Sequence, residues 1–274
     1  MNGVSILGGG WLGFPLALDL VKQNFSIRIS STTKDKLKHF RQIGLQAFDI
    51  ELDTRKSIQP EFWSEVLVIC IPPGRYGNYR AYTSKLQDLL RQMPADTVKQ
   101  IILISSTSVY PKISGNWNEK AVYDSESEPA TCILIAEQLV MNSHPTVVIL
   151  RMAGLAGYDR NPYLYGTGKF AGNEPVNMVH RDDAIAVIKH FIEHKNFRGI
   201  FNVCAPEHPL RRDYYAHGAH AVKQAAPQLP NSENPVLRVI NSDKLIELTG
   251  YTFLKPSPVH FWDEPSVLFY EIKT

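Results

Sequence analysis

Three glycines near the start of the chain, Gly8, Gly10 and Gly13, are spaced as G-x-G-x-x-G. In this pattern the first glycine permits a tight turn, the second lets backbone N–H groups approach a pyrophosphate, and the third lets a helix sit close to a strand. The pyrophosphate would rest on the N-terminus of the following helix, where unpaired N–H groups and the helix dipole favour an anion. The pattern predicts a dinucleotide-binding loop, with a plain structural turn as the alternative. The residues expected to contact the cofactor here are Gly8, Gly10, Trp11, Leu12 and Gly13.

The type of dinucleotide depends on the residues about 20 positions after the glycine loop. An NAD site usually carries Asp or Glu there, and this carboxylate holds the ribose 2′-hydroxyl and would repel a 2′-phosphate. This chain has Ser31, Thr32, Thr33 and Lys34 instead, and the first acid of the window is Asp35. Hydroxyls and an ammonium can bind a 2′-phosphate, so we expect NADP as the cofactor, with NAD as the second choice. The alternative is a solvated turn in which Ser31 or Thr32 caps a helix that begins near Asp35.

The loop must be held by a strand before it and a helix after it. Val4 to Leu7 is a short β-type run, Phe14 to Val21 has apolar residues at three- and four-residue intervals, and Phe25 to Ser30 is again strand-like. Strand, glycine loop, helix and strand together indicate a Rossmann βαβ unit. Further along, the sequence predicts strands over Val66 to Ile71 and Ile101 to Ile104, with a helix over Tyr79 to Met93 between them.

Strands that alternate with helices predict an α/β fold with a doubly wound parallel sheet. Ligands of such sheets lie beyond the carboxyl ends of the strands. We therefore expect the glycine loop, the Pro72–Pro73 pair and the Ser/Thr cluster after Ile104 to meet at one edge. The cofactor contacts expected from these later strands are Ile71, Pro72, Pro73 and Ser105.

Several segments resemble, in order along the chain, the motifs of one family. SSTSVYP is similar to the SS-x-x-VYG segment of the extended short-chain dehydrogenase/reductases, the NAD(P)-dependent epimerase/dehydratase family. VILRMAGLAGYDR, VNMVHRDDAIAVI, IFNVCAPEHP and VINSDKLIELTGYTFLKPS resemble later motifs of the same family. Extended members usually carry GxxGxxG, and Leu7 stands in place of the earliest glycine, which suggests an atypical branch. The stretches GWLGFPLA, SSTSVY and NVCAPEHP look closest to the YeeZ-type group of oxidoreductase-like members.

This resemblance implies chemistry by a Ser or Thr, a Tyr and a Lys arranged as S…YxxxK. The tyrosine exchanges a proton with the substrate, the lysine ammonium lowers the pKa of that tyrosine, and the Ser or Thr binds the substrate oxygen. Ser106 matches the serine position and is the first catalytic candidate. The resemblance thus implies an oxidoreductase or an epimerase/dehydratase.

The tyrosine–lysine dyad has no counterpart in this chain. When LIAEQLV is aligned on Glu137, the tyrosine place falls at Pro129 and the lysine place at Ile133. A slip of two residues gives Thr131 and Ile135, which carry no phenol and no ammonium either. The standard proton transfer is therefore not expected.

Two tyrosines near these positions are considered as substitutes. Tyr123 is the phenol nearest to the missing dyad and is the second catalytic candidate, with water as the other proton donor. Tyr110, four residues after Ser106, is a candidate for substrate contact, with aromatic packing beside the site as its alternative.

Three cations of the second half are further candidates for substrate binding. Arg151, at the end of an apolar strand, could clamp an anion bidentately, or it could form a structural salt bridge. Arg160 and Lys169 belong to a long loop, residues 157–175, whose cationic and aromatic side chains suit a polar or phosphorylated ligand. A solvated surface loop is the alternative.

His180, followed by Asp182 and Asp183, could form a proton relay. The surrounding pattern, however, favours a strand followed by a helix with the two aspartates in its first turn, where acidic side chains stabilise a helix.

The domain organisation follows from the same resemblance. Residues 1–153, with later strands from 176–206, are expected to form an NAD(P)-binding Rossmann domain. Residues 154–175 and 207–274 are expected to form a small C-terminal region that caps the substrate. The apolar tail after Pro258 should dock, with a subunit contact in a homodimer as one place for it.

Composition argues against several other classes of protein. The net charge is +2, from 29 basic and 27 acidic residues without long blocks, so neither nucleic acid nor a membrane is an expected partner. Cys70, Cys132 and Cys204 are far apart and indicate thiols in a reducing compartment, without a disulfide frame or a metal site. The apolar N-terminal run has no preceding Lys or Arg and contains glycines and a proline. It therefore matches neither a signal peptide nor a membrane span, and a cytoplasmic location is expected.

Two functions stay open. The first is an NAD(P)-binding enzyme that acts on a small polar substrate, which could resemble a sugar nucleotide. The second is a non-catalytic dinucleotide-binding sensor or scaffold. The missing dyad favours the sensor, whereas Ser106 and the polar loop favour the enzyme.

Overall fold

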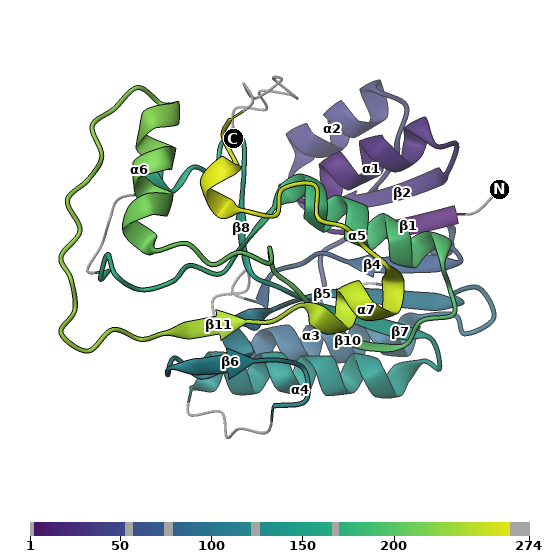
Figure 1. Ribbon diagram of the computed structural model, residues 1–274. Helices are drawn as coiled ribbons and strands as arrows, with labels where there is room; N and C mark the ends of the chain where they lie inside the picture. The colour runs from purple at the N-terminus through teal and green to yellow at the C-terminus, as the bar shows by residue number, and fades with distance from the viewer. Residues whose placement is uncertain (1–2, 53–56, 74–78, 122–126, 166–169, 264–274) are drawn as a thin grey trace. The chain divides into compact units, whose positions relative to one another are not determined.

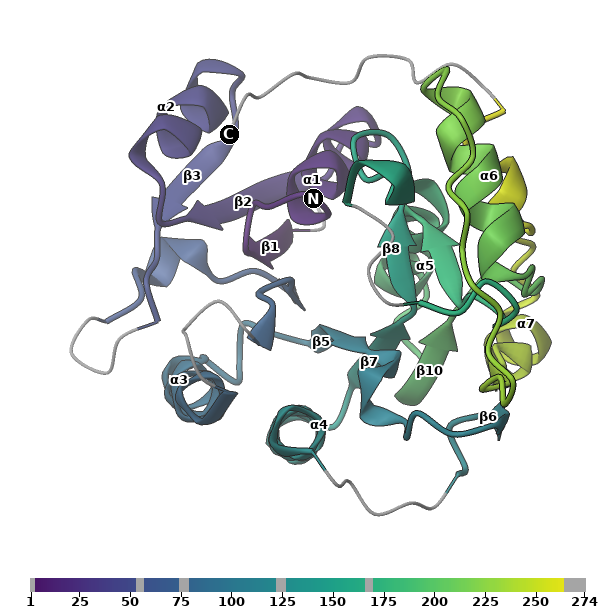
Figure 2. The same cartoon turned by 90° about the vertical axis from the view of Figure 1, so that its left-hand side faces the viewer.

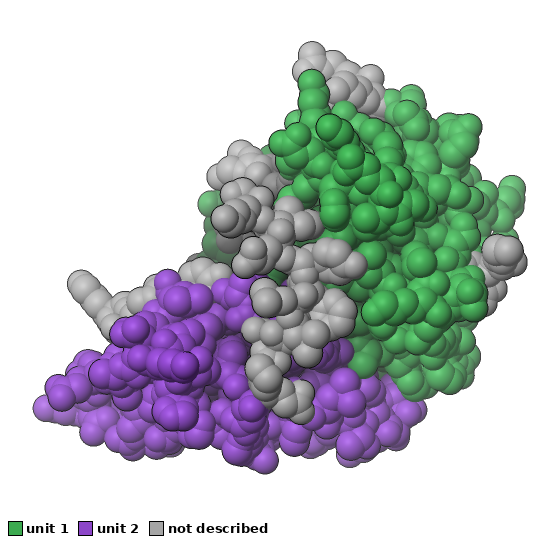
Figure 3. All heavy atoms as spheres, turned by 90° about the horizontal axis from the view of Figure 1, so that it is seen from above, with its two compact units in different colours: residues 1–111, 122–151, 185–201 green, residues 112–121, 152–184, 202–274 purple. Residues whose placement is uncertain are grey.

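The computed structural model describes residues 3–52, 57–73, 79–121, 127–165 and 170–263. The chain divides into two compact units, which Figure 3 shows in different colours. Unit 1 comprises residues 1–111, 122–151 and 185–201, and unit 2 comprises residues 112–121, 152–184 and 202–274.

Unit 1 is built on a seven-stranded sheet (Figure 1). The order of its strands is β10-β7-β5-β4-β1-β2-β3, and β1 pairs in parallel with both β2 and β4. The chain thus starts in the middle of the sheet and crosses over once, which confirms the predicted doubly wound Rossmann fold. The strands are β1 (Gly3–Leu7), β2 (Ser26–Ser31), β3 (Gln46–Asp49), β4 (Val66–Ile69), β5 (Gln100–Ser106), β7 (Val147–Met152) and β10 (Gly199–Val203).

Helices cover both faces of this sheet. Figure 2 shows α1 and α2 on one face and α3 and α4 on the other. A salt bridge of 2.5 Å between Lys189 and Asp19 holds α5 beside α1. The bounds of these helices are α1 (Gly13–Lys22), α2 (Lys34–Gln42), α3 (Tyr79–Gln92), α4 (Glu128–Ser143) and α5 (Arg181–Glu193).

Continuous apolar runs in the central strands explain why the sheet is buried on both faces. Every residue of β4 is buried, and so is every residue of β7. On the face covered by α3 and α4, Leu86 and Leu89 of α3 and Val140 of α4 join one hydrophobic cluster with these strands. These residues recur at three- or four-residue intervals on their helices, so one stripe of each helix is buried.

Unit 2 has two small sheets of two strands each. The strand β8 (Gly154–Ala156) pairs in parallel with β9 (Met178–His180), and β6 (Gly115–Trp117) pairs in parallel with β11 (Arg238–Ile240). A cluster that includes Tyr214, Tyr215 and Phe261 forms its core. Two helices lie entirely within this unit, α6 (Arg211–Ala221) and α7 (Asp243–Thr249). Within the part of the chain that the structure describes, no helix is long and apolar enough to cross a bilayer.

Candidate dinucleotide-binding site

The glycine loop follows β1 and is fastened to the strands on both sides. The Cys70 N–H donates to the carbonyl oxygen of Leu7 at 2.9 Å, so the loop starts beside the end of β4. On the other side, the Gly8 N–H donates to Ser30 Oγ at 2.9 Å, and the Gly9 N–H donates to the Ser30 carbonyl oxygen at 2.7 Å. Backbone and side chain of one buried serine therefore set the path of the loop.

The three pattern glycines have different reasons to be glycine. Gly8 has φ +108°, and a Cβ there would also lie 3.2 Å from the carbonyl carbon of Cys70. A Cβ on Gly13 would collide with the carbonyl oxygen of Gly8, so this glycine permits the close approach of α1 to β1. Gly10 is exposed, and no atom of the described residues comes within 4 Å of a Cβ placed there. The space in front of Gly10 is thus open for a ligand.

The N-terminus of α1 completes the loop. Leu12 is the N-cap and makes no side-chain capping bond, and no acidic side chain lies in the first turn of this described helix. In α1 the Phe14 N–H already donates to the Gly10 carbonyl oxygen at 3.0 Å, and Pro15 has no N–H. The positive end of the helix dipole still favours a negatively charged ligand such as a pyrophosphate at this end of the helix. The residues present fit a dinucleotide.

The segment expected to select the cofactor follows β2. Ser31 is half-buried, while Thr32, Thr33 and Lys34 are exposed. The N-cap of α2 is Thr33, without a side-chain capping bond, and Ser31 Oγ accepts a bond from the Thr33 N–H. Asp49, an exposed carboxylate that sequence reasoning missed, lies opposite Ser31 in the register of β2 and β3.

The end of β4 contributes a mostly apolar wall beside the loop. Ile71 is buried, Pro73 is half-buried, and Pro72 is exposed. Burial raises the pKa of the Cys70 thiol to about 12. The Cys70 thiol is therefore protonated at neutral pH.

A buried polar network lies beside the end of β5. Ser105 Oγ donates to Glu137 of α4 at 2.5 Å, and the Arg151 guanidinium donates to both oxygens of Glu137 at 2.7–3.2 Å. Arg151 also donates to Tyr110 Oη at 3.0 Å. The salt-bridged side chains of Arg151 and Glu137 are only 6% and 4% exposed.

This network changes the interpretation of two substrate-binding candidates. Burial opposes the charge on Arg151, but hydrogen bonds and the charge of Glu137 outweigh it and raise the pKa of Arg151 above its ordinary value. Because the guanidinium is already held by Glu137 and Tyr110, the geometry favours the structural salt bridge for Arg151 and packing for Tyr110. Neither side chain is placed to clamp a substrate.

Ser106, next to this network, is more accessible than Ser105. It ends β5 and is half-buried, and its Oγ accepts a hydrogen bond from the Ser108 N–H at 3.1 Å. Accepting this bond leaves the Ser106 hydroxyl proton available for a substrate oxygen.

The dyad positions on α4 carry no acid–base group. Pro129 and Thr131 are exposed, Ile133 is 5% exposed and Ile135 is 47% exposed. Tyr123, the phenol proposed as a substitute, lies outside the described residues, as does Lys169.

In unit 2 the structure brings two members of the suspected relay together, since His180 Nδ1 lies 3.5 Å from a carboxylate oxygen of Asp182. His180 ends β9 and is 4% exposed, and α5 starts at the next residue with Asp182 and Asp183 in its first turn. Burial lowers the pKa of His180, and its Nδ1 accepts a bond from the Asp182 N–H at 3.3 Å. Arg160 is half-buried and closes a tight turn with Gly157.

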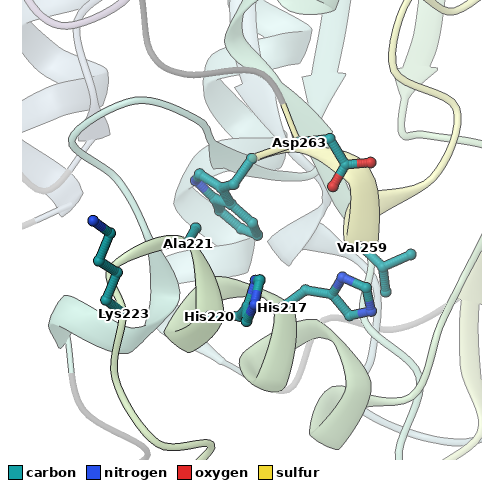
Figure 4. A pocket seen from close by; sticks show the side chains of 7 residues that line it. His217, His220, Ala221, Lys223, Val259 and Asp263 are labelled. Carbon is teal, nitrogen blue, oxygen red and sulfur yellow. The ribbon is translucent and has the colours of Figure 1, made fainter.

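A cavity of about 620 Å³ lies in unit 2, between the end of α6 and the chain around Trp262. Figure 4 shows His217, His220 and Lys223 along one side of it. None of the site residues predicted from the sequence lines this cavity.

Sequence reasoning overlooked Glu137 as a functional group, although a signal was present. Glu137 falls four residues after Ile133 and three before Val140, on the apolar stripe of α4 that is buried. A carboxylate on a buried stripe needs a partner. Asp49 was harder to find from the sequence, because only the register between β2 and β3 places it beside Ser31.

The order of the strands, with the glycine loop directly after the first strand, defines a doubly wound Rossmann fold. No family model matches the chain. Protein YeeZ of Escherichia coli (strain K12) is 30% identical over 269 residues, covering 94% of this chain and 98% of the relative. The chain belongs to the family of Protein YeeZ, the group that its motifs predicted.

Solved structures agree on the fold. A functionally unknown conserved protein from Silicibacter pomeroyi DSS matches with a TM-score of 0.77 and 17% identity, covering 96% of this chain and 97% of that chain. UDP-glucuronic acid 4-epimerase from Bacillus cereus, in complex with UDP-glucuronic acid and NAD, matches with a TM-score of 0.74 and 19% identity over the same shares.

Proposed function

We propose that this protein is an NAD(P)-binding oxidoreductase or epimerase/dehydratase-type enzyme. The observation that carries the proposal is the glycine loop, where Gly13 lets α1 approach β1 and an open space faces Gly10. The similarity to an epimerase described with bound NAD and UDP-glucuronic acid supports it. In this proposal residues 1–153 and strands from 176–206 bind the cofactor, and residues 154–175 and 207–274 cap the substrate.

The nicotinamide, when bound, would supply or accept a hydride. Backbone N–H groups around Gly10 and the start of α1 would hold the pyrophosphate. Ser106 would donate a hydrogen bond to the oxygen of a small polar carbonyl or hydroxyl compound. A sugar-nucleotide-like compound is the substrate class that the similar epimerase suggests.

NADP is the cofactor we favour, because exposed hydroxyls and Lys34 follow β2 where an NAD site usually has a carboxylate. Lys34→Ala is expected to weaken NADPH binding roughly 10-fold, the effect of losing one charge-assisted hydrogen bond, and to leave NADH binding unchanged. Fluorescence titration of both nucleotides measures this. Equal affinities that do not respond to the substitution would contradict the preference, and Lys36→Ala on the same helix is the charge-matched control.

Ser106→Ala tests the reaction itself. Removing the hydroxyl that binds the substrate oxygen should lower kcat/KM roughly 100-fold. This is the effect of losing one hydrogen-bond donor to an oxygen that gains negative charge in the transition state. The assay follows the absorbance of the nicotinamide with a panel of carbonyl and hydroxyl compounds. Ser108→Ala, an exposed hydroxyl two residues away, should have little effect. Unchanged turnover in Ser106→Ala would remove this serine from the mechanism.

A dinucleotide-binding sensor is the second candidate. The missing dyad favours the sensor, because Ile133 and Ile135 occupy the two alternative positions of the lysine. It predicts tight nucleotide binding without nicotinamide oxidation or reduction for any compound of the panel.

A further inference from the structure

One short arch of unit 1 carries Ser106, the residue proposed to bind the substrate oxygen. The arch comprises residues 105–110, which are the end of β5, a single turn of 3-10 helix, η3 (Thr107–Val109), and Tyr110. Inside the arch, the Ser108 N–H donates to Ser106 Oγ at 3.1 Å. Local bonds of this kind set the shape of the arch, and contacts with the rest of unit 1 set its place.

The first end of the arch is held through Ser105. Successive residues of a strand point to opposite faces of the sheet, so Ile101, Leu103 and Ser105 share one face. Ile101 and Leu103 pack in the hydrophobic cluster to which α4 contributes. Ser105 therefore faces α4, and its hydroxyl donates to Glu137 of this helix at 2.5 Å. Ser106 points to the opposite face of the sheet, away from Glu137.

The second end of the arch is held through Tyr110. Its hydroxyl oxygen accepts a bond from Arg151 Nη1 at 3.0 Å, and the guanidinium carbon lies 5.1 Å from the centre of its ring. The Tyr110 side chain is buried, so this contact is shielded from water. Arg151 belongs to β7, the neighbour of β5 in the sheet (Figure 2).

One buried ion pair joins the two ends. Arg151 Nε and Nη2 donate to Glu137 at 2.7–3.2 Å, so each nitrogen of the guanidinium has an acceptor. The planar guanidinium fixes the directions of all these bonds. Buried ion pairs often stabilise a protein no more than apolar side chains of the same volume. Stability alone therefore does not account for the pair, whereas a fixed place for the arch does.

We propose that Glu137 and Arg151 are positioning residues for Ser106, because together they clamp both ends of the arch that carries its hydroxyl. The inference rests on the proposed function, in which this hydroxyl donates to the substrate oxygen. A displacement of about 1 Å at a reacting group can lower a rate on the order of 100-fold. The clamp acts on the reaction through the place of Ser106, without contact between the ion pair and the substrate.

Ser105→Ala tests the clamp, because it frees the first end of the arch and leaves the ion pair in place. It should lower kcat/KM roughly 10-fold, a part of the loss that misplacement of a reacting group produces. The affinity for the nucleotide should not change. Ser143→Ala is the matched control, since it removes a serine hydroxyl that donates to the Val140 carbonyl oxygen at the end of α4. This control should preserve kcat/KM.

A double-mutant cycle with Ser106→Ala separates positioning from a general loss of structure. If Ser105 acts through Ser106, adding Ser105→Ala to Ser106→Ala should lower kcat/KM no further, because the hydroxyl that is positioned is already absent. An equal loss in both backgrounds would overturn the inference. Native turnover in Ser105→Ala would overturn it too, and would leave the proposed enzyme intact.

Hydrogen exchange of the backbone amides checks the clamp without turnover. Tyr110→Phe keeps the ring and removes the hydroxyl that Arg151 holds. When it is combined with Ser105→Ala, both ends are free, and the amides of residues 106–110 should exchange roughly 10-fold faster, as in segments that open locally. Native exchange rates in this double variant would overturn the inference. If the native protein binds nucleotide but turns over no compound of the panel, the proposed enzyme fails, and the exchange rates still decide whether the clamp holds the arch.

Discussion

A Gly13→Ala variant is expected to be less stable than the native protein and to bind a dinucleotide too weakly to measure. The added methyl carbon would collide with the carbonyl oxygen of Gly8, so α1 must move away from β1. Overpacking of this kind costs about 2–3 kcal/mol, which in a chain of this size lowers Tm by roughly 5–10 °C. The same movement displaces the helix N-terminus that would face the pyrophosphate. Thermal unfolding and calorimetry with NADPH measure the two effects.

Gly10→Ala is the matched variant, because its methyl group would meet no atom of the described residues within 4 Å. Its stability should stay within about 0.5 kcal/mol of the native value, as for other surface substitutions. The methyl group would nevertheless occupy the space in front of the loop. Displacing one hydrogen bond to a phosphate should weaken binding by roughly 10- to 100-fold. Native affinity in Gly10→Ala would show that no pyrophosphate lies on this loop.

Glu137→Ala is expected to be the most destabilising single substitution considered for this protein. It would leave the Arg151 guanidinium buried without its carboxylate partner. Breaking a buried pair in this way costs about 3–5 kcal/mol. Ser105 would lose its acceptor as well. Urea unfolding, with the slope of the transition as a check on compactness, measures the loss.

A double variant separates the effect of the buried charges on stability from the effect of lost packing. Glu137→Leu with Arg151→Met replaces both ions by apolar side chains and should recover most of the lost stability. Glu128→Ala, which removes an exposed carboxylate paired with Arg80 on the surface, should cost less than about 1 kcal/mol. If Glu137→Ala also lowered the free energy of unfolding by less than about 1 kcal/mol, water would have to reach the Arg151 guanidinium.

Most of unit 1 could be predicted from the sequence, because its signals are local. The apolar run at β4 and the alternation of strands with helices led to the correct fold, and the glycine spacing placed the loop between β1 and α1. The ends of elements were less accurate. β4 ends at Ile69, two residues before the expected end, and β5 continues to Ser106, two residues beyond it. Hydrogen bonding to neighbouring strands decides these ends, and it is not visible in a single run of residues.

The polar side chains of the site were harder to assign, because their partners are distant in the sequence. Arg151 looked equally suited to a ligand or a salt bridge until Glu137, 14 residues earlier, was found in contact with it. The bond of Tyr158 to Asp182, 24 residues later, does not follow from the local pattern either. Residue type suggests which chemistry a side chain can do, and tertiary contacts decide whether it is free to do it.

The double attachment of the glycine loop to Ser30 has a consequence for the thermodynamics of ligand capture. The amides of Gly8 and Gly9 are held by hydrogen bonds to this residue, so the protein's own contacts fix the path of the loop at these two positions. Rigid receptors lose little conformational entropy on association, and the ordering cost then falls on the incoming molecule. Loop closure should therefore not limit the rate at which a nucleotide associates.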